Sequence, residues 1–176
     1  MDFFTVPTAT FRVLYCFFVI SHSRRKVLHF NATEHPTSAW IGQQLREAFP
    51  EDTAPHYLIL DRDRKYEGEV TEVLQSLSSE LVRTSYQSPW QNGVAERWVG
   101  SCRRELLDHV IVLNETHLRR LVREYLAYYH ADRTHDGLGK DTPEKRPVEG
   151  RQVPHCQVVA LPRVGGLHHR YTWRAA

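Results

Sequence analysis

The stretch Phe11-Arg12-Val13-Leu14-Tyr15-Cys16-Phe17-Phe18-Val19-Ile20 decides the fold class, because it is an almost unbroken run of aromatic and aliphatic residues. Such a run is typical of a central strand that is buried on both faces. A short apolar segment at residues 3–6 precedes it, and an alternating segment at residues 26–30 follows it after a polar turn. These three segments together predict an antiparallel β-meander.

Helical and strand patterns alternate after the meander. Thr37 or Ser38 can cap a helix that continues to about Phe49, where Pro50 ends it. Further elements are expected as a buried strand at residues 57–60, a weaker helix at 69–77, a strand at 80–84, and helices at 94–110 and 115–130. The order βββαβαβαα predicts an α/β domain in which helices pack on a mixed sheet. Gly and Pro recur toward the end of the chain, so we assign residues 1–150 to the main domain and residues 151–176 to a C-terminal extension.

The bulk composition excludes several classes of protein. The length of 176 residues suits one domain, and the formal net charge of +2 does not by itself indicate a nucleic-acid partner. Three widely spaced cysteines, with no CxxC pair, argue against a disulfide framework and a zinc ribbon. The N-terminus lacks a signal-peptide pattern, and the longest apolar run is too short to span a bilayer. We therefore expect a soluble cytoplasmic protein with no membrane partner.

Three acidic residues occupy positions where a metal site could form on such a sheet. Asp2 begins the first expected strand, Asp61 ends the fourth, and Glu96 lies in the first turn of the helix that follows the loop at residues 88–93. Three converging carboxylates could hold two Mg²⁺ or Mn²⁺ ions about 3.5–4 Å apart. The competing interpretation is local, because a strand-terminal Asp often stabilises a turn and an early helical Glu offsets the helix dipole. The residue pattern alone leaves both interpretations open.

Three segments resemble the integrase core of bacterial insertion-sequence transposases and retroviral integrases. They are Asp-Phe-Phe-Thr-Val-Pro-Thr at residues 2–8, Leu-Asp-Arg-Asp at 60–63, and Ser-Pro-Trp-Gln-Asn-Gly-Val-Ala-Glu-Arg at 88–97. Asp61 and Glu96 stand 35 positions apart (96 − 61), which is similar to the D,D-35-E spacing of that family. Residues 103–110 and 128–138 also look like these transposases, so the resemblance covers roughly residues 1–150.

The resemblance implies a fold, an activity and a set of site residues. The implied fold is ribonuclease-H-like, with a five-stranded mixed sheet in the order 3-2-1-4-5 and helices on both faces. The implied enzyme is a DDE transposase or integrase, a polynucleotidyl transferase that uses two Mg²⁺ or Mn²⁺ ions and joins transposon ends to target DNA. Asp2, Asp61 and Glu96 match the catalytic, metal-binding carboxylates of the family. Family members work as multimers, so a homo-oligomer on DNA is expected.

Two groups of residues near Glu96 are candidate DNA contacts. Gln91, Asn92 and Gly93 resemble the mobile loop beside the active site, although a plain turn and helix entry would use the same residues. The second group lies within the helix that follows and comprises Arg97, Arg103 and Arg104. These arginines could contact phosphates, or they could form a solvated face with Glu105 and Asp108 as partners.

The sequence departs from the family pattern at its start. The first carboxylate of the family lies several residues inside a strand, whereas Met1 alone precedes Asp2, so we expect the N-terminal strand to be truncated. The region that recognises transposon ends is also missing. The alternative function is therefore a catalytically inert transposase remnant that retains only nucleic-acid binding. A ribonuclease-H-type nuclease remains a third possibility, and Asp63 is a candidate additional ligand.

Overall fold

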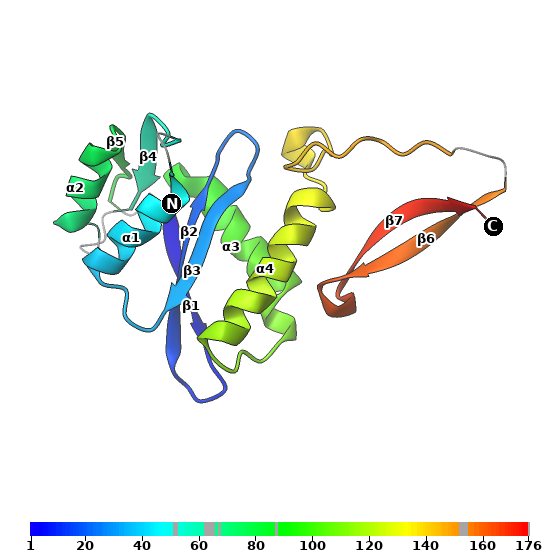
Figure 1. Cartoon of the computed structure of the whole chain (residues 1–176), viewed down its shortest axis with the longest axis horizontal. Coiled ribbons are helices and arrows are strands. Elements are labelled where there is room, and N and C mark those ends of the chain that lie inside the picture. The colour runs from blue at the N-terminus through cyan, green and yellow to red at the C-terminus, as the bar shows by residue number, and fades with distance from the viewer. Residues whose placement is uncertain (51–52, 62–65, 67, 87, 152–154, 176) are drawn as a thin grey trace.

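The computed structural model describes residues 1–50, 53–61, 66, 68–86, 88–151 and 155–175. Its central element is an antiparallel sheet in the order β1-β2-β3, formed by β1 (Asp2–Pro7), β2 (Val13–Ile20) and β3 (Val27–Thr33). The predicted meander is therefore confirmed, and β2 is its middle strand (Figure 1).

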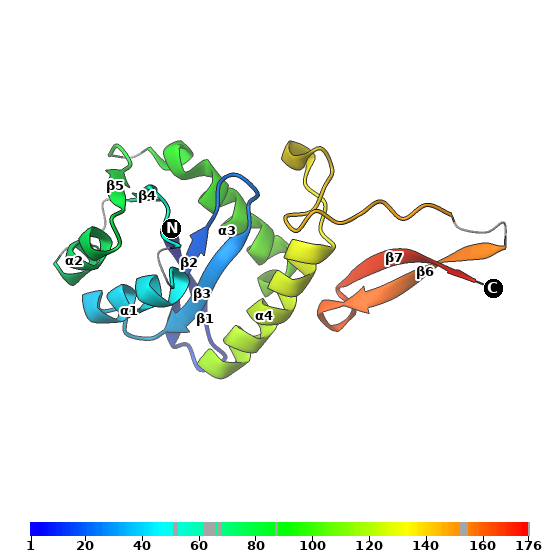
Figure 2. The same ribbon diagram turned by 45° about the horizontal axis from the view of Figure 1, so that its top comes forward.

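Helices cover both faces of this sheet, as Figures 1 and 2 show from two directions. They are α1 (Ser38–Ala48), α2 (Glu69–Ser76), α3 (Gly93–Glu105) and α4 (Glu115–Ala131). The alternation of side chains along β2 explains this arrangement. Phe18 packs in a core with α3 and α4, whereas Phe17 packs in a second core with α1 and α2, and both side chains are fully buried. The uninterrupted hydrophobicity of β2 thus reflects burial on both sides.

The α3 end of the first core also buries two cysteines. Cys16 of β2 and Cys102 of α3 are both fully buried, and burial raises the pKa of the Cys102 thiol to about 12. Burial likewise raises the pKa of Cys16 above its usual range. Cys156, in contrast, is partly exposed. All three cysteines are free thiols.

A second, short sheet pairs β4 (Tyr57–Leu60) with β5 (Glu80–Arg83) in parallel. The N-terminal amine of Met1 donates a hydrogen bond to the carbonyl of Ile59 at 2.8 Å, which links β4 to the start of β1. The observed sheets remain separate ladders, so the five-stranded order 3-2-1-4-5 stays a prediction. Each strand of this sheet has only four residues, which limits the ladder that it can form.

The helix that carries Glu96 is shorter than predicted. It ends at Glu105 rather than at residue 110, and a 3₁₀ turn, η3 (Leu107–His109), follows it. Leu106 leaves helical geometry with φ −135° and is fully buried in the first core. Burial of this side chain therefore overrides the local helical pattern. The other 3₁₀ turns are η2 (Pro89–Asn92), η4 (Asp136–Leu138) and η5 (Val164–Gly166). Among the described residues, no helix is long and apolar enough to cross a membrane.

The C-terminal segment forms an antiparallel hairpin of β6 (Cys156–Arg163) and β7 (His168–Ala175). In both ribbon views the hairpin lies outside the sheet and its helices, next to α4. The His168 ring stacks on the Tyr128 ring, with centroids 4.4 Å apart and planes inclined by 6°. The domain boundary near residue 150 stays a prediction, since the hairpin and α4 are in contact.

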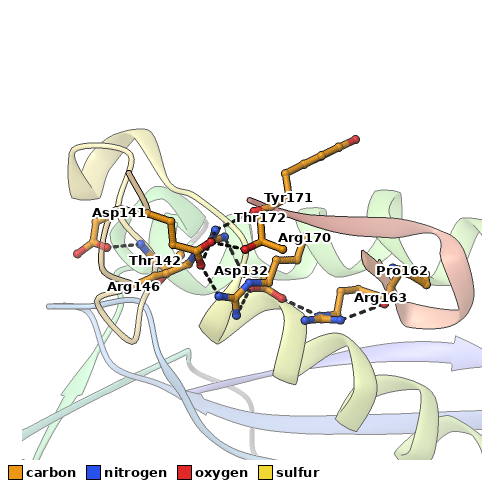
Figure 3. A network of polar contacts seen from close by, with 10 residues as sticks. Asp132, Asp141, Thr142, Arg146, Pro162, Arg163, Arg170, Tyr171 and Thr172 are labelled. Carbon is orange, nitrogen blue, oxygen red and sulfur yellow. Dashed lines mark hydrogen bonds and ion pairs between the residues drawn. The ribbon is translucent and has the colours of Figure 1, made fainter. Parts of the chain in front are cut away.

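One buried carboxylate anchors the hairpin to the end of α4. The side chain of Asp132 is 3% exposed, and Arg163 Nε donates to its Oδ2 at 2.8 Å. Guanidinium nitrogens of Arg146 and Arg170 lie 3.8 and 3.6 Å from its Oδ1 (Figure 3). These three arginines come from both strands of the hairpin and from the segment that precedes it, so Asp132 joins all of these parts.

Asp132→Ala should release the hairpin from α4 and lower the free energy of unfolding by about 1–3 kcal/mol, because Arg163 loses a hydrogen-bond acceptor and Arg146 and Arg170 lose a buried counter-ion. Hydrogen exchange of residues 156–175 measures the release, and protection there should fall while β2 keeps its protection. Asp108→Ala, which removes an exposed carboxylate, is the matched control. Equal protection of the hairpin in both variants would contradict the anchoring role.

Candidate active site

The first candidate carboxylate, Asp2, lies at the start of β1 between two hydrogen-bond donors. The backbone N–H of Phe3 donates to Asp2 Oδ1 at 2.7 Å, and Asn92 Nδ2 donates to Asp2 Oδ2 at 3.2 Å. Asn92 is buried at the junction of η2 and α3, and its Nδ2 also lies 3.4 Å from the carbonyl oxygen of Met1. The loop at residues 88–93 thus brings an amide onto Asp2, a contact that the sequence alone did not indicate.

The charges of the other two predicted carboxylates act on Asp2. Burial raises the pKa of Asp2 to about 6, and the negative charges of Asp61 and Glu96 raise it as well. The Phe3 N–H and the N-terminal amine oppose this shift. Asp61 directly follows β4, and Glu96 lies in the first turn of α3 with its side chain exposed. Acidic groups from three distant parts of the chain therefore contribute to the electrostatic surroundings of Asp2.

The oxygen donors of this region suit a divalent cation, although the carboxylates do not form a preformed coordination site. Among the described residues, no three His, Cys, Asp or Glu side chains lie close enough together to hold a metal ion. Asn92 Oδ1, however, is a buried oxygen that has no hydrogen-bond partner among the described residues. Carboxylate and amide oxygens are the ligands that Mg²⁺ prefers. A bound cation would also offset the repulsion that raises the pKa of Asp2. Asp63, the additional candidate, lies outside the described residues.

Mg²⁺ should stabilise the protein at about pH 7.5 and much less at about pH 5, because Asp2 must be ionised to bind a cation. Burial raises the pKa of Asp2 from 3.8 to about 6. In the metal-free protein, the stability that protonated Asp2 contributes is present below pH 4 and is lost as the pH rises through about 6. Thermal unfolding with and without MgCl₂ at both pH values measures the effect. Asp2→Asn should remove most of the pH dependence, and equal stabilisation at both pH values would contradict the prediction.

The loop residues predicted to contact DNA have different surroundings. Gln91 is exposed, and its Oε1 accepts a hydrogen bond from the Ser85 N–H at 2.7 Å, so it ties the loop to the end of β5. Gly93 is the first residue of α3, and a Cβ added at this position would meet no neighbouring atom within 4 Å. Asn92 turns its amide toward Asp2, as described above. A DNA contact for these three residues stays a prediction.

The predicted arginines also divide into two sets. Arg103 Nη2 donates to the carbonyl of Thr5 at 3.1 Å, and its guanidinium lies 5.8 Å from the centroid of the Phe4 ring. Arg97 and Arg104 instead line a cavity on another side of α3. Glu105, considered as a partner for these arginines, binds Arg133 at 2.6 Å.

Two further arginines line the same cavity and were not predicted from the sequence. Arg25 belongs to the turn between β2 and β3, and Arg133 follows α4. Neither has a distinctive local pattern, because only the packing of three distant segments brings them together. A prediction that they lie beside Arg97 and Arg104 would require knowledge of the tertiary fold.

The structure is similar to retroviral integrases despite low sequence identity. A chain from the cryo-EM structure of the simian T-cell lymphotropic virus intasome in complex with the PP2A regulatory subunit B56 gamma matches with a TM-score of 0.67 and 15% identity. The match covers 99% of the present chain but only 65% of that chain. The HTLV-2 integrase catalytic core domain in complex with magnesium (trimeric form) matches with a TM-score of 0.62 and 14% identity. This second match covers 81% of the present chain and 91% of that chain. The fold is therefore an α/β fold of the retroviral integrase core type.

A sequence comparison points to the same group. Residues 77–143, which include Glu96, α3 and α4, match the integrase core domain family. No curated protein matches the chain. The predicted resemblance to the integrase cores of DDE transposases and retroviral integrases is thus confirmed by the segment match and by the fold.

Proposed function

We propose that this chain is a metal-dependent polynucleotidyl transferase that cuts and joins DNA strands during integration or transposition. The observation that carries the proposal is the electrostatic effect of Asp61 and Glu96 on Asp2. Asp2 begins β1, Asp61 directly follows β4, and Glu96 lies in the first turn of α3. The match of residues 77–143 to the integrase core domain family supports it independently. We also propose that β4 and β5 extend the meander in the order 3-2-1-4-5, since Met1 hydrogen-bonds to Ile59.

In this proposal, Asp2, Asp61 and Glu96 would hold two Mg²⁺ or Mn²⁺ ions. When bound, such ions supply activation of a water or 3′-hydroxyl and stabilise charge on the leaving oxygen of an in-line phosphodiester displacement. The amide of Asn92 holds the Asp2 carboxylate through Nδ2, and its Oδ1 has no hydrogen-bond partner in the part of the chain that the structure describes. This contact fixes the orientation of a side chain at the start of a strand, where fraying would otherwise spoil its geometry.

The remaining predicted residues would hold the substrate. The loop residues Gln91, Asn92 and Gly93 lie within five positions of Glu96 in the chain (96 − 91), and Arg97, Arg103 and Arg104 follow it on α3. We propose that they contact the phosphates of transposon ends and target DNA. The similar structures come from an intasome and from a trimeric form of an integrase core, which supports a homo-oligomer on DNA for this chain too. Residues 1–150 would form the catalytic core, and residues 151–176 an extension.

A strand-transfer assay with labelled donor DNA tests the proposal directly. The wild-type chain should produce joined products with MgCl₂ and none with EDTA, and Asp61→Asn should produce none in either buffer. A correctly folded wild-type chain that binds DNA without any Mg²⁺-dependent product would indicate an inert remnant. Preferential cleavage of an RNA–DNA hybrid over duplex DNA would indicate a ribonuclease-H-type nuclease instead.

A further inference from the structure

A cavity of about 410 Å³ lies beside α3, the end of α4 and the turn between β2 and β3. Four arginines line it and give it the name arginine cavity: Arg25, Arg97, Arg104 and Arg133. The volume is large compared with the roughly 30 Å³ that one water occupies in the liquid. The cavity therefore has room for a polyatomic ligand.

The protein neutralises the positive charge of this cavity only in part. Arg133 is paired, because Glu105 accepts hydrogen bonds from its Nε and Nη2 atoms. Within the described part of the chain, no carboxylate forms an ion pair with the other three arginines of the cavity. Asp136 also lines the cavity, but no ion pair joins it to any of the four guanidinium groups. Three arginine charges therefore remain available to an anion.

One buried N–H group of the cavity wall lacks an acceptor among the described residues. It is Trp98 Nε1, which belongs to a residue that is 1% exposed. His135 is buried as well, but the backbone carbonyl of Tyr129 accepts a hydrogen bond from its ring. Arg133 Nη1 lies 3.1 Å from His135 Nδ1. Because a guanidinium can only donate, Nδ1 accepts, and the hydrogen of the neutral ring is on Nε2. Burial, Arg133 and Arg25 lower the pKa of His135 to about 4, which keeps the ring neutral at pH 7.

We propose that the arginine cavity binds a phosphate group of the DNA backbone, at a site separate from the three carboxylates. A phosphate carries negative charge and several acceptor oxygens, which match the three unpaired guanidinium groups and the N–H donor of Trp98. None of the lining residues other than Asp136 offers a competing carboxylate among those described.

The arrangement along α3 favours a polymer over a free ion. Arg97 directly follows Glu96, and Arg104 lies seven residues further along the helix (104 − 97). This separation corresponds to about 10.5 Å along the helix axis, which matches about three base-pair steps of about 3.4 Å each along the DNA axis. A strand held at Glu96 can therefore continue along α3 into the cavity. The choice of DNA as the source of the phosphate rests on the proposed function.

Binding of a fluorescent DNA duplex of arbitrary sequence, measured by anisotropy in EDTA, tests the inference without requiring metal or catalysis. Arg25→Gln and Arg97→Gln should each weaken binding about tenfold, and each should reduce the slope of log K against log salt by about 0.9 if one phosphate contact is lost. Arg123→Gln removes the same charge from an exposed position of α4 and is the control. Circular dichroism of each variant establishes that it is folded.

Gly137→Ala offers a second variant that keeps every charge. A Cβ at this position would lie 2.0 Å from a guanidinium nitrogen of Arg25, so the Arg25 side chain must move away. We expect DNA binding to weaken in this variant as well. DNA affinity that is unchanged in Arg25→Gln, Arg97→Gln and Gly137→Ala would overturn the inference.

A competition experiment with inorganic phosphate distinguishes the two possible ligands of the cavity, a phosphate of the DNA backbone and a free phosphate ion. Competition of phosphate with DNA that disappears in Arg25→Gln supports the proposal. Phosphate binding that Arg25→Gln abolishes, together with unchanged DNA affinity, would overturn DNA as the ligand. These outcomes are independent of catalysis. Absence of strand transfer together with DNA binding that depends on the cavity arginines would refute the proposed function alone. Strand transfer together with DNA binding that does not depend on these arginines would refute this inference alone.

Discussion

Glu96→Gln is expected to keep the fold and to lower metal-dependent strand cleavage and joining by roughly a thousandfold, which corresponds to the several kcal/mol that a metal ion contributes to such a transition state. The substitution preserves the shape of the side chain and removes one negative charge. Glu96 is exposed in the first turn of α3, so the free energy of unfolding should change by less than about 0.5 kcal/mol.

The matched control for this variant is Glu124→Gln, which removes a charge from an exposed position of α4. It should cleave and join DNA like the wild type. Initial rates with MgCl₂ and thermal unfolding of both variants separate a catalytic defect from a folding defect. Near-normal turnover of Glu96→Gln would remove Glu96 from the active site.

Trp98→Ala is expected to cost about 3–5 kcal/mol of the free energy of unfolding, the range for deletion of a large buried aromatic side chain. Trp98 is 1% exposed, and its ring centroid lies 4.3 Å from that of Phe18 and 5.7 Å from that of Phe4. These contacts join α3 to the central sheet. Because a small domain is typically stable by only about 5–15 kcal/mol, the variant should be marginally folded.

Urea unfolding measures this loss, and Trp90→Ala is the natural control. Trp90 belongs to η2 and is 73% exposed, so its removal should change the stability by less than about 0.5 kcal/mol. Trp98→Phe should retain most of the stability, since it preserves an aromatic ring at the same position. Equal urea midpoints for Trp98→Ala and Trp90→Ala would contradict the role of Trp98 in attaching α3.

The elements that local pattern determines were predictable from the sequence. The hydrophobicity of β2 correctly indicated burial on both faces. Thr37 was a candidate cap, and its Oγ1 accepts a hydrogen bond from the Trp40 N–H at 3.2 Å. Such features depend on neighbours within a few residues, which is why sequence reasoning reaches them.

Features that depend on distant contacts were missed. The helix α3 ends at Glu105 because Leu106 is drawn into the core, and a propensity pattern contains no sign of that competition. The C-terminal hairpin was expected only as a peripheral extension. An isolated two-stranded hairpin is marginal in water, and the cluster around Asp132 that holds this one brings together residues far apart in the chain.

The candidate site shows the same division. The spacing of Asp61 and Glu96 and the resemblance around them pointed to the three carboxylates. The coupling of Asp2 with both residues depends on the packing of β1, β4 and α3, which the sequence does not display. Asn92 is predicted to contact DNA, and the structure adds a hydrogen bond from its amide to Asp2 that the sequence did not indicate. An amide side chain in a loop predicts a hydrogen bond, but the sequence does not reveal the partner of that bond.

The unequal burial of the three thiols makes the hairpin accessible to site-directed labelling. A maleimide reacts with thiolate, and burial disfavours the thiolate of Cys16 and of Cys102. Cys156 is partly exposed at the first position of β6. A single fluorophore or spin label can therefore be attached there in the natural sequence, where it would report movement of the hairpin relative to α4 when DNA is added.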